Sequence, residues 1–255
     1  MFWWRERVDP DDELYGVEWA VTDRVGGASR GPWSGLNLGS HVGDAPADVA
    51  TNRQRLARSL EVPVDALRFM DQQHGTQVVQ VRGDHGRTEQ PVAAPACDAL
   101  VTDTPDVVLL ALVADCTPVL IVDRVAGLAA AVHAGRKGLV AAVVPVTLAR
   151  MRALGAADLQ AVVGPSICGR CYEVSAPMRA EAGEVSAAAH SVSWAGTPAI
   201  DVAAGVVEQL AAEGVPCRWL GGCAREVEDL YSYRRDGRTG RYAGVVRLLA
   251  PHRAA

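Results

Sequence analysis

The stretch VVLLALVADCTPVLIVDRVAGLAAAVHAG, residues 107–135, decides the fold. It contains three apolar runs with almost no alternation between apolar and polar residues, and each run has the length of one strand. Such runs are typical of strands that are buried on both faces of a sheet. The turn residues Arg124 to Gly127 separate the last two runs. The stretch therefore predicts neighbouring strands in a well-buried sheet.

Polar side chains stand at the ends of these apolar runs. Asp115 and Cys116 precede the second run, and His133 closes the third. His133 comes 17 positions after Cys116, which suits two adjacent strands joined by a short turn, so we expect their side chains to meet at one end of the sheet. His74 lies 42 residues before Cys116, in a segment over 65–82 that reads as a separate hairpin of strand, polar turn and strand. The spacing along the chain does not show whether His74 lies near Cys116 and His133 in the fold.

Two interpretations of these polar residues stay open at this point. A cysteine beside a buried strand is usually a small apolar side chain, and a histidine there often bonds only a backbone carbonyl. Alternatively, one thiolate and two imidazoles suit Zn²⁺: His74, Cys116 and His133 would leave a fourth position for water, as catalytic zinc sites do. Asp115 would then act as a general base or anchor one imidazole.

The rest of the chain reads as one α+β domain over 1–255, with mixed β-sheets covered by helices. We predict a strand over 14–25, a long loop over 26–46 and a helix over 46–62. A surface loop is expected over 83–98, and His85, His190 and His252 are expected to be exposed. Later segments predict a helix over 138–155 kinked at Pro145, a strand in LQAVV, a helix that Asp201 caps and Gly214 closes, and a last strand after SYRRDGRTGR.

Two cations are unusual. Arg53 falls within the apolar stripe of the predicted helix over 46–62, either as a side chain that reaches to water or as an inward guanidinium that binds an anion. Lys137 is the only lysine and lies among glycines after His133. The pair Cys168 and Cys171 forms a C-x-x-C without a second pair at zinc-finger spacing, so structural thiols are favoured over a redox or metal site.

Composition excludes several classes of function. The net charge is −5 and aromatic residues make up 5% of the chain, which predicts no nucleic-acid surface. No signal peptide is visible, and the longest apolar run, residues 107–114, is too short to span a bilayer. Six cysteines in 255 residues indicate reduced thiols rather than a disulfide framework. We therefore expect a cytoplasmic protein, with a monomer favoured.

The motifs around these residues are similar to those of the bacterial laccase-domain proteins, also described as multicopper polyphenol oxidase-like proteins and as purine nucleoside phosphorylases. The resemblance runs from about residue 22 to 247. In chain order, the matching stretches are SGLNLGSHVGD, NRQRL, QQHGTQVV, DALVTDTPDVVLLALVADCTPVLIVD, AAVHAG, VGPSICGRCYEV and SYRRDGRTGR.

The resemblance implies a zinc held by His74, Cys116 and His133, with copper as an adventitious occupant. It also implies phosphorolysis of adenosine, inosine, guanosine and 5′-methylthioadenosine, and deamination of adenosine. The expected partners are thus a purine nucleoside and phosphate. The candidate substrate contacts are Arg53 and Lys137 for phosphate, with His41 and Asn37 from the SGLNLGSHVGD stretch.

One departure from the family pattern lies beside His133. The family usually has His-Ala-Gly-Trp-Arg-Gly where this chain has His-Ala-Gly-Arg-Lys-Gly, so Arg136 replaces the tryptophan and Lys137 replaces the arginine. Positive charge is kept, but a stacking surface and a bidentate guanidinium are lost at those positions. This departure bears on substrate preference and on activity itself.

Three other functions are weighed against this one. A metal-free hydrolase would use Cys116 as nucleophile and His133 as base, acting on a peptidoglycan precursor. A true multicopper oxidase is disfavoured because six scattered histidines cannot furnish both a blue copper site and a trinuclear cluster. A binding module without catalysis would leave the histidine, cysteine and glycine motifs unexplained.

Overall fold

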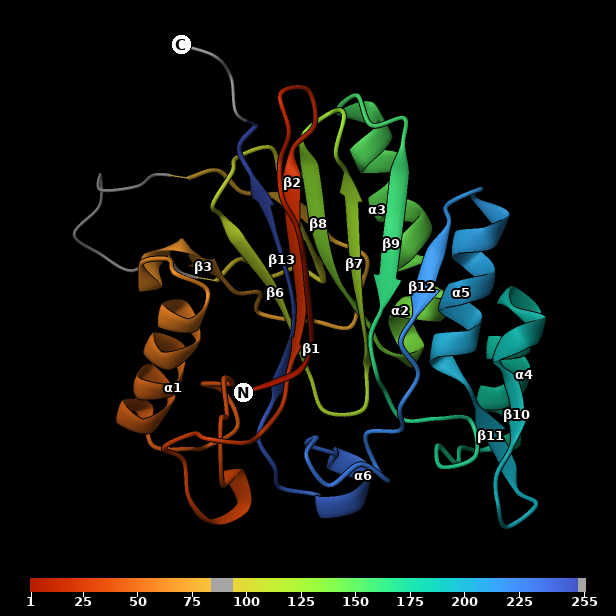
Figure 1. The fold of residues 1–255 in the computed structure, drawn as a ribbon. Coiled ribbons are helices and arrows are strands. Elements are labelled where there is room, and N and C mark those ends of the chain that lie inside the picture. Colours follow the sequence, from red (N-terminus) through yellow and green to blue (C-terminus); the bar gives the residue numbers. More distant parts are fainter. Residues whose placement is uncertain (84–93, 252–255) are drawn as a thin grey trace.

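The computed structural model describes residues 1–83 and 94–251, and shows two sheets packed face to face with helices on their outer sides (Figure 1). The predicted fold class, α+β with mixed sheets covered by helices, is confirmed. The expected loop over 83–98 lies largely outside the described residues, as do His85 and His252, whereas His190 is exposed as predicted.

The five-stranded sheet has the order β1-β2-β13-β6-β3. Its pairs are antiparallel except for β3 beside β6. The strands are β1 (Phe2–Val8), β2 (Gly16–Thr22), β13 (Tyr242–Leu249), β6 (Val108–Val113) and β3 (Leu67–Arg68).

The six-stranded sheet has the order β12-β9-β7-β8-β5-β4 and contains the second and third apolar runs. These runs form antiparallel neighbours, as predicted, and the register places Pro118 opposite His133. The two outermost pairs are parallel. The strands are β12 (Cys217–Trp219), β9 (Leu159–Val163), β7 (Thr117–Asp123), β8 (Leu128–Ala134), β5 (Ala99–Thr102) and β4 (Val78–Gln80).

Helices cover both outer faces of the sheets. Helix α1 (Pro46–Ser59) packs Leu56 against the five-stranded sheet, whereas α2 (Arg136–Val140), α3 (Val143–Ala153) and α5 (Val202–Ala212) cover the six-stranded one (Figure 1). Helix α4 (Ala176–Val185) lies against the hairpin β10 (His190–Val192) and β11 (Pro198–Ile200), and α6 (Tyr233–Asp236) is short. Three 3₁₀ turns occupy Gly31–Trp33, Val64–Ala66 and Ala187–Ala189.

The layers explain why the apolar runs do not alternate. Leu120 and Ala131 face the other sheet, while their neighbours Ile121 and Ala130 face the helices. Every residue of β6, β7 and β8 is consequently buried. Within the described part of the chain, no helix has the length and apolar character needed to cross a membrane.

Two predictions of local structure are wrong. The segment over 65–82 is not a hairpin, because β3 joins one sheet and β4 the other. The helix over 138–155 is two helices, separated at Ala142 by a left-handed backbone (φ 64°). Pro145 falls in the first turn of α3, where no backbone N–H is needed, and so does not kink it. The cap at Asp201 is confirmed by its bond from the Ala204 N–H.

Candidate active site

His74, Cys116 and His133 come together at one end of the six-stranded sheet. His74 lies on the loop between β3 and β4, Cys116 immediately precedes β7, and His133 lies in β8. His74 Nε2 is 3.8 Å from Cys116 Sγ, and the two imidazole rings meet edge to face with centroids 4.7 Å apart. One ligand atom from each of the three residues lies within 4.8 Å of the others. These residues can therefore hold one metal ion.

Asp98, immediately before β5, holds both histidines of the cluster in place. It is fully buried, and its Oδ1 accepts from His133 Nδ1 at 2.9 Å and from the His74 backbone N–H at 2.9 Å. Its Oδ2 accepts from the Gly75 N–H at 2.7 Å. Burial opposes the charge of Asp98, but these bonds outweigh burial and lower its pKa. The bond to Nδ1 leaves Nε2 of His133 available for a metal.

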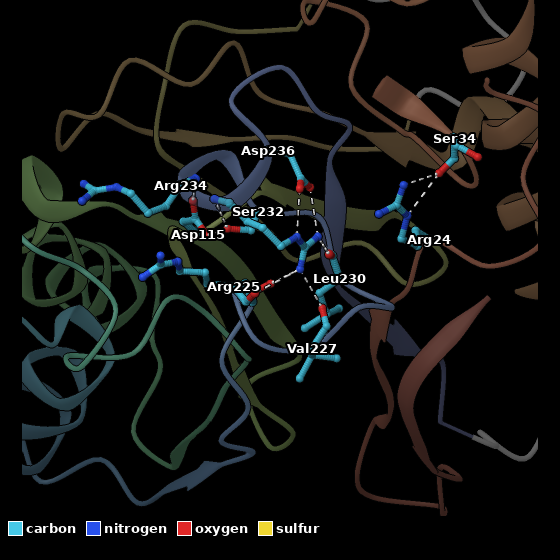
Figure 2. A network of polar contacts seen from close by, with 11 residues as sticks. Arg24, Ser34, Asp115, Arg225, Val227, Leu230, Ser232, Arg234 and Asp236 are labelled. Atoms are coloured by element: carbon cyan, nitrogen blue, oxygen red, sulfur yellow. Dashed lines mark hydrogen bonds and ion pairs between the residues drawn. The ribbon is translucent and has the colours of Figure 1, made fainter. Parts of the chain in front are cut away.

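Asp115 does not anchor an imidazole, contrary to that part of its predicted role. Its oxygens accept at 2.6 Å from the Ser232 hydroxyl and at 2.6 Å from the Arg234 backbone N–H, as Figure 2 shows. The left-handed backbone of Asp115 (φ 103°) sends its carboxylate toward α6. The anchor is Asp98, which the sequence analysis missed; its signal was a carboxylate directly before a buried apolar strand.

The thiol and the imidazole of this cluster favour their charged forms together. Burial alone would raise the pKa of Cys116, but the neighbouring His133 and His74 outweigh burial and lower it. Burial likewise opposes charge on His133, and the Cys116 thiolate and Asp98 carboxylate raise its pKa. The pocket therefore favours a thiolate, which is the form of cysteine that binds metal.

Glycine is the only residue type that fits at position 135, beside the side chains of His74 and Cys116. A Cβ added there would lie 2.8 Å from His74 Cδ2 and 3.1 Å from Cys116 Sγ. We expect Gly135→Ala to displace both side chains and to weaken metal binding by about tenfold or more, as disturbed ligand orientation does. Competition with a chromophoric chelator measures the affinity. Gly183→Ala, whose added methyl meets His190 at an ordinary 3.5 Å, is the matched control. Equal metal affinity in the two variants would contradict this role for Gly135.

The ligand cluster opens into a cavity of about 410 Å³. His41 and Asp115, two of the predicted site residues, line it. The cavity wall also contains three arginines and two tyrosines that the sequence analysis did not assign: Arg136, Arg234, Arg241, Tyr172 and Tyr233. The cavity thus joins metal-ligating atoms, positive charge and aromatic surface.

Arg241 is one of three cavity arginines, with Arg136 and Arg234, whose guanidinium groups use only Nη1 in hydrogen bonds to the described residues. Its Nη1 donates to the carbonyls of Thr239 and Gly240, while its Nε and Nη2 have no protein partner among the described residues. Burial lowers the pKa of its guanidinium. Arg136 pairs with Glu181, and Arg234 lies over the Tyr172 ring. A partly desolvated guanidinium with two vacant donors is suited to bind an anion.

Comparison with known proteins identifies the relatives of this chain. Residues 18–249 match the family described as multi-copper polyphenol oxidoreductase laccase. The chain belongs to this family.

Curated relatives of this laccase-family chain are named purine nucleoside phosphorylases. One from Streptomyces coelicolor is 48% identical over 93% of this chain and 98% of its own length, and one from Mycobacterium tuberculosis is 43% identical over 94% and 95%. Among solved structures, YlmD from Geobacillus stearothermophilus is 31% identical with a TM-score of 0.80, covering 92% of each chain. YfiH from Bacillus licheniformis has a TM-score of 0.82 at 27% identity, covering 94% of this chain and 98% of its own.

Three predicted substrate contacts of the laccase-family chain lie outside the cavity lining. Arg53 donates from Nε and Nη2 to the Leu38 carbonyl and stacks on Phe69, so it braces the loop over 26–46. Asn37 is fully buried, and its Oδ1 accepts from the backbone N–H of Arg241. Both residues therefore support the chain around Arg241. Lys137 is exposed on α2, and its neighbour Arg136 faces the cavity instead.

Proposed function

We propose that this chain is a zinc-dependent purine nucleoside phosphorylase. Its proposed substrates are adenosine, inosine, guanosine and 5′-methylthioadenosine, with deamination of adenosine as a second activity. The observation that carries the proposal is the single cavity that combines the His74, Cys116 and His133 ligand atoms with arginines and tyrosines. The names of the curated relatives support the same reaction.

The donor set fits zinc. One sulfur and two imidazole nitrogens form a three-ligand set, and the cavity beside them leaves a fourth position accessible. Zn²⁺ bound there would supply a Lewis acid and a water with lowered pKa. The chain itself contributes Asp98, which keeps the Nδ1 proton of His133 and directs Nε2 toward the ligand position.

The arginines of the cavity are proposed to hold phosphate, and the tyrosines to flank the purine. Arg241 would donate its vacant Nε–H and Nη2–H groups, and Tyr172 and Tyr233 offer aromatic surface on the same wall. Asp115 is the proposed general base. Its carboxyl lines the cavity, and burial raises the pKa of this group. His41 is proposed to contact the substrate from the loop over 26–46.

Replacing Arg241 by methionine is expected to raise the KM for phosphate by about 10- to 100-fold. A hydrogen bond to a charged group contributes roughly 1.5–3 kcal/mol, which corresponds to that range. Steady-state kinetics at varied phosphate measures the effect. Lys137→Met removes one positive charge from the exposed side of α2 and is expected to leave this KM unchanged. A larger increase in the KM for phosphate in Lys137→Met than in Arg241→Met would instead indicate that Lys137 binds phosphate.

Product analysis tests the reaction. Zinc-loaded protein incubated with adenosine and phosphate is expected to form adenine, ribose-1-phosphate and inosine, separated by chromatography. Protein that carries zinc in the cluster and yields none of these products would refute the proposal.

A second candidate, hydrolysis by a metal-free thiolate, rests on one specific observation. Cys116, the adjacent His133 and the Asp98 bonded to His133 Nδ1 are the residue types of a nucleophile, a base and an orienting carboxylate. A peptidoglycan precursor would be the substrate class. Metal analysis separates the two functions: one equivalent of zinc per chain that wild type binds and Cys116→Ala loses argues against a free thiol nucleophile.

A further inference from the structure

A second group of metal-ligating side chains lies outside the proposed active site. Cys168, Cys171, Cys223 and Glu226 place three sulfurs and one carboxylate oxygen within 4.8 Å of one another. The C-x-x-C motif therefore has the second ligand pair that its sequence spacing did not reveal. That pair comes from the loop that follows β12, about 50 residues further along the chain.

Each pair of ligands sits on a tight turn of the same spacing. The Cys171 N–H donates to the Cys168 carbonyl at 2.9 Å, and the Glu226 N–H donates to the Cys223 carbonyl at 3.0 Å. Two turns of the pattern ligand-x-x-ligand that face each other are the usual way in which proteins build a closed, four-ligand zinc site.

Polar contacts already join the two turns. The Cys171 thiol donates to Glu226 Oε1 at 3.2 Å, and the Cys168 backbone N–H points at Cys223 Sγ at 3.4 Å. Zinc–sulfur bonds of 2.3 Å in a tetrahedron set neighbouring sulfurs about 3.8 Å apart. The ligand atoms of the cluster, all within 4.8 Å of one another, need to draw together by about an ångström at most to reach that spacing. Cys171 and Cys223 are buried, and Glu226 closes the group from the solvent side.

We propose that Cys168, Cys171, Cys223 and Glu226 bind a second divalent, thiophilic cation, Zn²⁺, as a structural site with all four positions filled by the protein. Binding releases the thiol protons, including the one that Cys171 shares with Glu226. With no open position, this site has no catalytic role.

The position of the cluster explains what such a metal would stabilise. Ile167 and Tyr172, which flank the C-x-x-C turn, both line the active-site cavity. The Ile167 N–H donates to the Asp115 carbonyl. On the other side, Arg235 donates to the carbonyls of Arg225 and Val227. The Arg235 backbone N–H in turn donates to Ser232, whose hydroxyl donates to Asp115 (Figure 2). The second metal would thus join two loops that support one cavity wall.

Metal counting tests the proposal independently of any activity. Full-length protein is saturated with zinc, desalted and analysed for metal per chain. Wild type is expected to retain two equivalents, Cys116→Ser one, Cys171→Ser one, and the double variant none. Cys217→Ser is the matched control, because this half-buried thiol on β12 belongs to neither group and both equivalents should remain. One equivalent in wild type that Cys171→Ser does not change would overturn the proposal.

Cobalt spectroscopy covers the case in which Cys171→Ser does not fold. In Co²⁺-loaded Cys116→Ser, only the second cluster supplies thiolates, so strong thiolate-to-cobalt charge-transfer absorption is expected in the near ultraviolet. Adding Glu226→Gln should weaken Co²⁺ binding while keeping this absorption, whereas adding Glu226→Cys should increase it. Absence of the band in folded Cys116→Ser, or a disulfide between Cys168 and Cys171 in freshly purified protein, would overturn the site.

Discussion

Cys116→Ser is expected to remove the metal from the active site and to lower the rate of phosphorolysis by about a thousandfold or more. The thiolate is the one anionic ligand of the His74, Cys116 and His133 set, and the pocket favours its charged form. A bound Lewis acid contributes several kcal/mol to stabilising a transition state, and each 1.36 kcal/mol is a factor of ten. Metal analysis and initial rates with inosine and phosphate measure both losses.

The control for this variant is Cys217→Ser, which changes a thiol outside both clusters and should keep full activity. Two outcomes would contradict the account. In one, Cys116→Ser keeps both its active-site metal and its rate; in the other, it loses its rate while the metal stays bound. The second outcome would favour Cys116 as a nucleophile.

Asp98→Asn is expected to reduce zinc affinity by about 10- to 100-fold, the usual effect of losing the carboxylate behind a histidine ligand. The carboxylate accepts from the His133 ring and from the backbone N–H groups of His74 and Gly75, all in a fully buried place. An amide oxygen cannot satisfy all three donors. Each buried donor left unpaired costs about 1–3 kcal/mol of folding stability. Metal competition and denaturant unfolding measure the two effects.

Asp123→Asn separates the loss of metal from the loss of stability. Asp123 is as buried as Asp98 and accepts from backbone N–H groups of Val125, Ala126, Ala157 and Asp158 at the far end of β7. This variant should be destabilised comparably yet bind zinc like wild type. Similar zinc affinities in Asp98→Asn and Asp123→Asn would show that Asp98 does not orient the ligands.

The sheet containing Cys116 and His133 was predictable because the signals for it lie close together in the sequence. Continuous apolar runs indicate burial on both faces, and a four-residue turn between two runs determines which strands are neighbours. The segment over 65–82 was misread for the opposite reason. Its two short strands belong to different sheets, and that choice depends on partners far along the chain.

The ligands of the candidate site could be predicted, but the residues around them less so. His74, Cys116 and His133 are unusual residues at strand ends and in recognisable motifs. Arg53 and Lys137 are equally unusual in sequence, yet whether a long cationic side chain faces a cavity depends on the loop that packs over it. Arg241 faces the cavity because Asn37 and Leu38 bond its backbone from some 200 residues away. The spacing of residues along the sequence does not predict a contact between segments so far apart.

The phosphate dependence of nucleoside cleavage tests the central claim most directly. Zinc-loaded protein is mixed with inosine and inorganic phosphate, and ³¹P NMR follows the phosphate while absorbance follows hypoxanthine. The account predicts one ribose-1-phosphate for each hypoxanthine released, and no release without phosphate. Hypoxanthine accompanied by free ribose, or no turnover when the active site holds its full equivalent of zinc, would contradict it.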